Sequence, residues 1–403
     1  MIVYSEVLYS MKTTFNPTIK NNLLNQIKSK KPMLLENAMI YQDGMFKKMN
    51  LFLKDGKIVD LTKFNPDNTT QFDIVDLQGN YLTPSLVDQH VHGGLGYDFN
   101  TANESQMRAM LRKMKEFGCG AILATFIPGR ADVLNRQIDI IKNIMDDPKD
   151  DETKIAGIHL EGPFINPLKS GIHPLRTMMP LTLENAKKIN LNDVKIVTVA
   201  PELDKGFKTI KYFLSKGIIP SAGHSVASAD LIKESRVPLI THLFNAMSGY
   251  HHRLPTIANE GLENNDISVE LNTDNKLIHY GTMDLVAKTK PEDKFIMISD
   301  ALAGASCNEK SFDMNGKTIY IDKDGTLRDE NNVLAGSNKY LGQVAKDIVE
   351  NTKIKFADFI RYASENPAKN IGIIDKHRIA KGTSPSLTLW DKETLEPVIT
   401  FEV

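Results

Sequence analysis

The feature of this sequence that most constrains its fold is a set of histidines and acidic residues that follow short apolar runs. Imidazole and carboxylate groups are ligands for borderline cations such as zinc. In a parallel β/α barrel the ends of the strands meet at one rim, where the active site is built. The pattern therefore predicts a metal site at the rim of a barrel. Six such residues stand at the ends of five runs: His90 and His92, Glu161, His224, His242 and Asp300.

The apolar runs also predict the number of strands. They alternate with amphipathic segments of helical periodicity, such as 104–117 and 132–145. Alternation of this kind is typical of a parallel sheet, and eight repeats indicate closure into a barrel. The predicted fold class is therefore α/β, a (β/α)8 TIM-like barrel. Its expected strands are 82–87, 121–126, 156–160, 194–199, 218–222, 239–244, 268–271 and 295–299.

Both ends of the chain have β character outside this alternation. Segments 33–41 and 57–61 are the clearest strands before the barrel, and Asp-Gly turns lie between them. Segment 386–403 returns to β character. We therefore expect the two ends to build one small β-sandwich domain. The predicted divisions are an N-terminal extension at 1–31, partly helical, a small β domain at 32–82 and 377–403, and a metal-dependent catalytic barrel at 83–376.

Composition argues against several classes of partner. The formal net charge of −1 gives no electrostatic reason to bind nucleic acid or an anionic membrane. No apolar run approaches the roughly 18–20 residues that span a bilayer, and residues 1–31 lack the order of a secretory signal. The two cysteines, Cys119 and Cys307, make no disulfide framework. We expect a cytoplasmic protein that binds neither nucleic acid nor membrane.

The grouping of ligand types indicates catalysis rather than a structural metal. His90 and His92 are two residues apart, so both side chains leave the same face of a strand. Two histidines and a glutamate leave a fourth coordination position open for water, as catalytic zinc sites do. Zinc lowers the pKa of such a water from about 15.7 to about 7, and a neighbouring carboxylate can take its proton and pass it to a leaving group.

Each of these residues also has an ordinary interpretation. A single histidine after an apolar run is more often structural or solvated, and Asp300 alone could be a helix N-cap. His159 points away from the side of Leu160 and is interpreted as a core histidine or one that supports the metal ligands. His251 and His377 are predicted to lie on the surface. The repetition of ligand types at five strand ends is what favours the metal site.

Several longer motifs together resemble the amidohydrolase superfamily and, within it, the N-acetylglucosamine-6-phosphate deacetylase family. Many superfamily members use a carboxylated lysine as a bridging ligand, whereas these deacetylases, like this chain, have a glutamate at the third strand. That glutamate argues against a dihydroorotase or a hydantoinase. The resemblance covers about 84–372. Its most specific segments are His-Leu-Glu-Gly-Pro-Phe at 159–164 and Lys-Ser-Gly-Ile-His-Pro at 169–174, supported by 223–225, 241–247 and 334–337.

The resemblance implies a set of metal ligands. Glu161, His224 and His242 would hold the principal divalent metal ion, expected to be zinc. His90 and His92 would allow a second ion, which some members of the family have and others lack.

It also implies catalytic and substrate-binding residues. Asp300 would be the general base and then the general acid, and His173 would polarise the acetyl carbonyl or position the substrate. Asn245, the backbone of Ala246 and Arg253 would hold a sugar phosphate, for which the planar fork of arginine is suited. The implied reaction is deacetylation of a phosphorylated amino sugar, N-acetylglucosamine 6-phosphate, to glucosamine 6-phosphate and acetate. Relatives are usually homodimers in which the neighbouring subunit can contribute to the phosphate site.

The sequence departs from the family after the seventh strand. Members usually carry Ala-Asp-Gly-x-His there, with the histidine on the substrate, whereas 272–279 reads Asn-Thr-Asp-Asn-Lys-Leu-Ile-His. Leu277 takes the place of the histidine, and His279 could substitute only if the loop shifts. A second departure, Ser-Pro-Ser-Leu at 384–387, concerns the small domain. Two alternatives stay open: a deacetylase of another N-acetylated sugar or amino acid, and a sensor that binds an amino-sugar phosphate without cleaving it.

Overall fold

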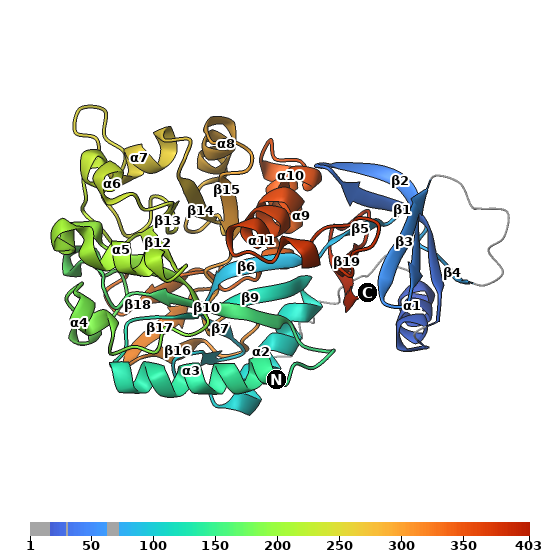
Figure 1. Ribbon diagram of the computed structural model, residues 1–403, viewed down its shortest axis with the longest axis horizontal. Coiled ribbons are helices and arrows are strands. Elements are labelled where there is room, and N and C mark those ends of the chain that lie inside the picture. The colour runs from blue at the N-terminus through green and yellow to red at the C-terminus, as the bar shows by residue number, and fades with distance from the viewer. Residues whose placement is uncertain (1–16, 30, 63–71) are drawn as a thin grey trace, which may run out of the picture.

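The computed structural model describes residues 17–29, 31–62 and 72–403. It consists of a large barrel and a smaller β domain beside it (Figure 1). Of the predicted N-terminal extension, residues 17–29 form helix α1 (Pro17–Ser29), and residues 1–16 lie outside the described part of the chain. Among the described residues, no helix combines the length and the apolar character needed to cross a membrane.

The barrel is an eight-stranded parallel sheet, which confirms the predicted fold class. Neighbouring strands pair in the order β15-β14-β13-β12-β11-β10-β9-β6. All eight strands are almost wholly buried, as expected when helices cover a parallel sheet. In chain order they are β6 (Leu86–Val91), β9 (Cys119–Phe126), β10 (Lys154–Glu161), β11 (Val194–Val199), β12 (Ile219–Ala222), β13 (Leu239–Ile240), β14 (Ser268–Asn272) and β15 (Phe295–Ile298).

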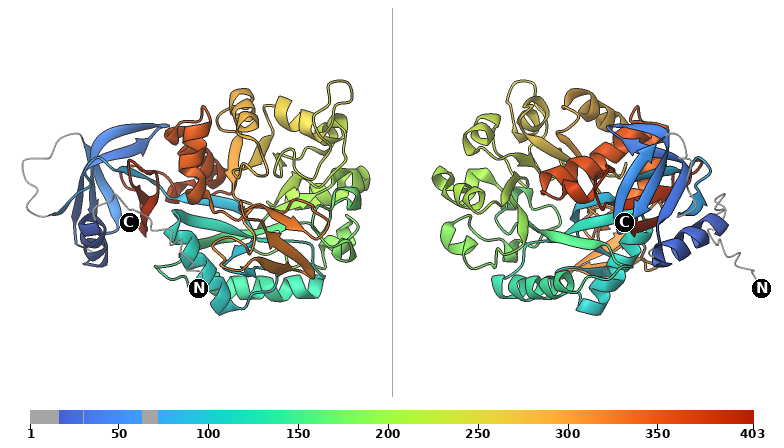
Figure 2. Two further views of the ribbon diagram at one scale, coloured as in Figure 1. Left: turned by 180° about the vertical axis from the view of Figure 1, so that it is seen from behind. Right: turned by 45° about the vertical axis from the view of Figure 1, so that its right-hand side comes forward.

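Helices surround this sheet (Figure 2). Helix α2 shows why they form: its side chains buried at i, i+3, i+4 and i+7 from Met107 face the strands, and an Asn103–Gln106 capping box starts it. The α-helices are α2 (Glu104–Glu116), α3 (Ala131–Asp146), α4 (Leu183–Ala186), α5 (Lys208–Ser215), α6 (Ala229–Ser235), α7 (Ile257–Glu263), α8 (Tyr280–Thr289), α9 (Leu341–Asn351), α10 (Phe356–Ile360) and α11 (Asn366–Asn370). A π-helix (Arg361–Glu365) joins the last two, and 3₁₀ turns occur at Pro167–Lys169, Leu175–Thr177, Pro201–Leu203, Lys205–Phe207 and Ile374–Lys376.

The barrel closes through the segment that follows β15. The backbone N–H of Asp300 donates to the carbonyl of His90 at 2.9 Å, and that of His92 donates to the carbonyl of Ala301 at 2.8 Å. The buried carboxylate of Asp88 accepts from the backbone N–H of Ser299 at 3.3 Å. Two of the predicted site segments therefore form the seam of the barrel, which fixes their backbones relative to each other.

The small domain is built from both ends of the chain. Its strands form one mixed seven-stranded sheet, in which β19 pairs with β5 and β5 pairs with β1. Helix α1 packs on it by burying Ile19 and Leu23. The strands are β1 (Met33–Gln42), β2 (Met45–Lys54), β3 (Lys57–Thr62), β4 (Asp73–Asp76), β5 (Tyr81–Pro84), β19 (Ser386–Trp390) and β20 (Pro397–Glu402).

Two short sheets lie outside these domains. Strands β16 (Ser311–Met314), β17 (Lys317–Ile321) and β18 (Leu327–Asp329) form an antiparallel sheet after the last barrel strand, and β7 (Gly93–Gly94) pairs with β8 (Tyr97–Asp98) near the start of the barrel.

Two predicted strands differ from the structure. The run expected at 82–87 is divided at Ser85 into β5, which belongs to the small sheet, and β6, which begins the barrel. The strand expected at 239–244 ends at Ile240, because the backbone turns at His242, where φ is 30°.

The prediction that His377 lies on the surface is wrong. Its side chain is 2% exposed, and its Nδ1–H donates to the carbonyl of Ser85 at 3.1 Å. Ser85 is the residue at which the chain passes from the small sheet into the barrel. The hydrogen bond of His377 therefore stabilises the junction of the two domains. Burial lowers the pKa of His377 to about 4.

We expect His377→Asn to flatten the dependence of stability on pH. The amide Nδ2 can replace Nδ1–H as donor to Ser85, but it does not titrate. In the wild type the unfolded chain binds the extra proton between pH 6.5 and about 4, so stability is lost as the pH falls through this range. From pH 7 to pH 5 the wild type should lose roughly 2 kcal/mol more than the variant. Denaturant unfolding at both pH values measures this, and parallel losses would contradict it.

Candidate metal centre and active site

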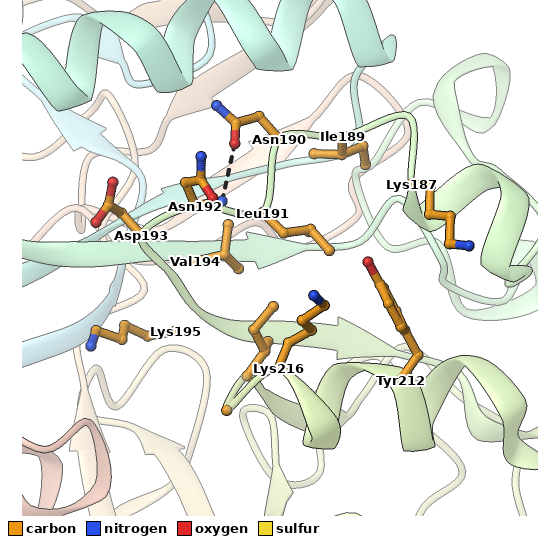
Figure 3. Close-up of a pocket in the computed structure, with 12 residues that line it drawn as sticks. Lys187, Ile189, Asn190, Leu191, Asn192, Asp193, Val194, Lys195, Tyr212 and Lys216 are labelled. Atoms are coloured by element: carbon orange, nitrogen blue, oxygen red, sulfur yellow. Dashed lines mark hydrogen bonds between the residues drawn. The ribbon is translucent and has the colours of Figure 1, made fainter.

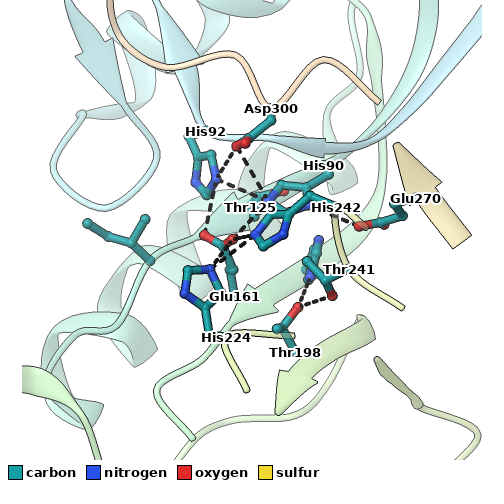
Figure 4. A network of polar contacts seen from close by, with 12 residues as sticks. His90, His92, Thr125, Glu161, Thr198, His224, Thr241, His242, Glu270 and Asp300 are labelled. Carbon is teal, nitrogen blue, oxygen red and sulfur yellow. Dashed lines mark hydrogen bonds and ion pairs between the residues drawn. The ribbon is translucent and has the colours of Figure 1, made fainter. Parts of the chain in front are cut away.

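The predicted ligand residues lie together at the ends of the barrel strands that carry them (Figure 4). They come from distant parts of the chain because parallel strands all end at the same rim of a barrel. The six are buried or nearly so. His90 lies in β6 and His92 just after it, Glu161 ends β10, His224 and His242 follow β12 and β13 by two residues, and Asp300 follows β15 by two.

Three of these side chains form a nearly equilateral triangle. Glu161 Oε1 lies 3.1 Å from His224 Nε2 and 3.0 Å from His242 Nε2, and the two nitrogens are 3.1 Å apart. Three ligands of one tetrahedral zinc ion, with bonds of roughly 2.0–2.1 Å, lie about 3.3–3.4 Å from one another. The triangle is therefore slightly contracted relative to three ligands of one ion.

A second group shares Glu161 with the first. The Nε2 atoms of His90 and His92 are 3.2 Å apart, and each lies 3.4 Å from a carboxylate oxygen of Glu161. Asp300 Oδ1 is 3.3 Å from His92 Nε2 and 3.7 Å from His90 Nε2. Glu161 thus lies between two groups of donors. Among the described residues, the ligand atoms of His90, His92 and Asp300, and those of Glu161, His173 and His224, are close enough together to hold a metal ion.

The positions of the protons show that the first group fits a cation. His224 Nδ1 lies 2.7 Å from the carbonyl of Lys169, which can only accept, so Nδ1 carries the proton. Burial lowers the pKa of His224 to about 4, so the ring is neutral at pH 7 and its Nε2 is unprotonated. This lone pair faces the carboxylate of Glu161. Two acceptors at hydrogen-bond distance with no proton between them repel, and a cation between them removes the repulsion.

His90 is oriented in a similar way by Glu270. His90 Nδ1 lies 3.1 Å from Glu270 Oε2, and the other oxygen of Glu270 accepts from Gln89 Nε2 at 2.7 Å. His90 directs Nδ1 to Glu270 and Nε2 to the centre. Burial would lower the pKa of His90, but the neighbouring Glu161 and Glu270 outweigh it and raise this pKa, so a cation at the centre would take the place of the Nε2 proton. A carboxylate behind a histidine is the usual arrangement for fixing the tautomer of a metal ligand. Sequence reasoning missed Glu270, although a buried charge in an apolar strand was the available signal.

His159 does not face the centre. Its Nδ1–H donates to the carbonyl of Gln89 at 3.1 Å, and its Nε2 accepts from Thr198 at 2.8 Å. Thr198 in turn accepts from Thr241, which accepts from Ser221. Both ring nitrogens are engaged, and burial lowers the pKa of His159 well below its ordinary value. His159 is therefore a neutral interior residue that packs edge-on against His90.

The acids of the centre are ionised in spite of their burial. Burial alone would raise the pKa of Glu161, but the neighbouring His173 and His90 outweigh it and hold this pKa well below its usual range. Burial opposes ionisation of Asp300 as well, but the hydrogen bond to His92 and the charge of His90 lower the pKa of Asp300. Anionic carboxylates are the form that binds a cation or accepts a proton.

The backbone at three of these residues is strained. His224, His242 and Asp300 have φ values of 46°, 30° and 52°, in a region that residues with a Cβ seldom adopt. Such conformations persist only where the surrounding structure imposes them, and they concentrate at functional sites. Here each turns a side chain inward directly after its strand ends.

Of the other predicted site residues, one lies in the centre and the rest are half-buried or exposed. His173 is buried with its Nε2 2.9 Å from Glu161 Oε2, so it joins the centre. Asn245 and Ala246 are half-buried in the turn after His242. Arg253 is exposed, and its guanidinium lies 2.9 Å from His252. His279 is exposed at the start of α8, where its Nδ1 accepts from the backbone N–H of Gly281.

Sequence reasoning also missed Asn272. It is the last residue of β14, and its Nδ2 donates to Asp300 Oδ2 at 2.8 Å. The rule that polar residues at barrel strand ends serve the site would have found it.

A separate cavity of about 570 Å³ lies at the opposite ends of β11 and β12 (Figure 3). It is lined by Asn190, Asn192, Tyr212 and Lys216 among others, without a histidine. This cavity is distinct from the cluster of ligand residues, which lies at the rim where active sites of such barrels occur.

Comparisons with known proteins identify the family. The Amidohydrolase family model matches residues 81–402, so the chain belongs to the amidohydrolase family. The resemblance inferred from the motifs is thereby confirmed.

Individual relatives have narrower names. An N-acetylglucosamine-6-phosphate deacetylase of Bacillus subtilis (strain 168) is 28% identical over 355 residues, which cover 85% of this chain and 89% of the relative. The crystal structure of N-acetylglucosamine-6-phosphate deacetylase from Pasteurella multocida has a TM-score of 0.82 at 27% identity and covers 92% of this chain and 98% of that one. The enzyme of the same name from Thermotoga maritima has a TM-score of 0.81 at 26% identity, with the same coverage.

We expect zinc to raise the thermal unfolding midpoint of chelator-treated protein, because the cation relieves the repulsion around Glu161. At a free concentration 1,000 times the Kd, the stabilisation should be about 4 kcal/mol. Glu161→Gln should remove most of the shift. His159→Gln is the matched control, since His159 is buried beside the centre but has no free nitrogen. A full zinc shift in Glu161→Gln, measured by calorimetry, would refute the assignment of this centre.

Proposed function

We propose that this chain is a metal-dependent hydrolase that deacetylates N-acetylglucosamine 6-phosphate to glucosamine 6-phosphate and acetate. The observation that supports it most is the Glu161–His224–His242 triangle with the Asp300 carboxylate beside it. Relatives that are similar to nearly the whole of this chain, in sequence and in structure, are named for this activity.

The proposed ligands of the principal metal ion are Glu161, His224 and His242, and the proposed ion is zinc. His90 and His92, together with Glu161, would hold a second ion where one binds. Their Nε2 lone pairs and the anionic carboxylate suit a borderline divalent cation. When bound, such an ion acidifies water and polarises a carbonyl oxygen.

Asp300 is the proposed residue for both proton transfers. Its Oδ1 is directed to the interior of the centre, toward His92 and His90. From there it can take the proton of the attacking water as the new C–O bond forms. It then delivers this proton to the amide nitrogen as the C–N bond breaks, so that the amine leaves neutral. His173, on the other side of Glu161, would stabilise the developing oxyanion or position the acetyl group.

The sugar phosphate would bind at the turn after His242. Asn245 offers an amide there, and the backbone of Ala246 and the exposed Arg253 and His279 are the further proposed contacts. Arg253 is a suitable phosphate ligand by its chemistry. We propose a homodimer in the cytoplasm, in which the neighbouring subunit helps to complete the phosphate site.

Another N-acetylated sugar or amino acid is the second candidate substrate. One observation favours it: Leu277, which replaces the histidine of the family motif, packs partly buried against the barrel core, and His279 is turned to solvent. A sensor without catalysis is disfavoured, because each proposed ligand and the proposed base are present and lie together.

Substrate choice is tested by turnover of phosphorylated and unphosphorylated N-acetylglucosamine. Under our proposal kcat/KM is higher for the phosphorylated sugar by at least about 100-fold, which corresponds to roughly 2.7 kcal/mol of binding in the transition state. Equal values for the two sugars would favour the second candidate. Failure to release acetate from either sugar by the zinc-loaded protein would refute the proposed function.

Asp300→Asn should retain bound zinc and lose activity. The amide has the shape of the carboxylate but cannot accept the proton, so kcat should fall by about 10²–10⁴-fold. Acetate release and elemental analysis on the same preparation measure both properties. An Asp300→Asn enzyme with wild-type kcat would show that the base is another residue.

A further inference from the structure

The stretch that departs from the family motif begins with a residue whose side chain joins two parts of the site. Asn272 is 1% exposed at the end of β14. Its Nδ2 donates to Asp300 Oδ2 at 2.8 Å, and its Oδ1 accepts from Asn245 Nδ2 at 3.0 Å. The proposed base and a proposed phosphate ligand are therefore connected through one side chain.

The direction of this chain of hydrogen bonds is fixed by chemistry. An ionised carboxylate has no proton to donate, so Asn272 must turn its NH₂ group to Asp300. Its carbonyl oxygen then faces Asn245, which must donate in turn. Asp300 thus sets the orientation of both amides, and Asn245 is left with its Oδ1 and one remaining N–H for other partners.

The hydrogen bond also restricts Asp300 itself. Its Oδ2 is held by Asn272, which leaves Oδ1 toward His92 at 3.3 Å. Without the amide donor, the carboxylate could rotate about its Cβ–Cγ bond and present both oxygens to a cation. A carboxylate bound through both oxygens has lost the basicity that proton transfer requires.

We propose that Asn272 is a positioning residue, which keeps one oxygen of Asp300 away from the metal ligands and couples its orientation to Asn245. This inference rests on the proposed deacetylase function. It assigns to the divergent segment a role in catalysis in place of the direct substrate contact that the family motif provides.

A purely structural role for Asn272 makes a different prediction. The backbone of β14 pairs with β13 and β15 whatever the side chain is. Leucine matches the shape of asparagine and suits a buried strand end. If Asn272 served only to fill space, its replacement by leucine would leave kcat unchanged.

The test is Asn272→Leu, with Asn272→Val in parallel in case one variant folds poorly. We expect kcat to fall about 10- to 100-fold, the usual effect of removing a group that orients a site residue. The zinc content should stay within about twofold of the wild type, whereas KM for N-acetylglucosamine 6-phosphate should rise, because Asn245 loses the acceptor that orients it. A wild-type kcat in either folded variant would overturn the proposal, as would loss of zinc in proportion to activity.

Thr273→Val is the matched control. Thr273 is the next residue, also buried, and its hydroxyl donates to the carbonyl of Ile298 at 3.0 Å and not to Asp300. Its loss should lower stability with little change in kcat. An equal loss of kcat in Thr273→Val would show that any disturbance at this strand end impairs the enzyme, and would contradict a specific role for Asn272.

The coupling to Asn245 is tested by the double variant Asn245→Ala/Asn272→Leu. If the two amides act in one chain, their effects on kcat overlap, and the double variant should be close to the worse single variant. Multiplied effects would refute the coupling. A wild-type enzyme inactive on N-acetylglucosamine 6-phosphate would instead refute the proposed function, so the two failures can be told apart.

Discussion

The arrangement of this site depends on a buried carboxylate surrounded by histidine side chains. Glu161 lies within 3.4 Å of nitrogen atoms from five histidines: His90, His92, His173, His224 and His242. At His224 the proton is directed away from Glu161 to the carbonyl of Lys169, and at His90 it is directed to Glu270. Two acceptors that face each other in a low-dielectric interior, as His224 Nε2 and the Glu161 carboxylate do, are unfavourable by themselves, and a divalent cation between them resolves this.

The rest of the barrel keeps these groups in place. The seam between His90 and Asp300 joins two site segments through their backbones. A series of hydrogen bonds runs from Ser221 through Thr241 and Thr198 to His159. Each hydroxyl in the series donates to the next residue, so none of these buried groups lacks an acceptor. A network in which every member has a partner is rigid, and this rigidity holds the side chains of the centre in place.

The sequence contained enough to predict the barrel and the convergence of the candidate ligand residues, because the ends of parallel strands converge whatever lies between them. Glu161 and His242 could be grouped on that rule although 81 residues separate them. The rule does not say which sheet a run joins, so the division at Ser85 was not foreseen. Likewise a lone histidine gives no sign of its burial, and His377 was misplaced for that reason.

Residues that act through another side chain were the hardest to predict. Glu270 contacts the site through His90, and Asn272 contacts it through Asp300. These partners are 180 and 28 residues away in the sequence. No local pattern records such a pairing. The family motif directed attention to the histidine position of 272–279, and the structure shows in addition that the first residue of the stretch contacts the proposed base.

The central claim is that a cation binds between Glu161, His224 and His242. Anomalous diffraction at the zinc absorption edge, from crystals of the active protein, locates that ion directly. We expect a peak about 2.0–2.2 Å from the Glu161 carboxylate and from the Nε2 atoms of His224 and His242. Fully active crystals with no anomalous peak at this position would contradict the account.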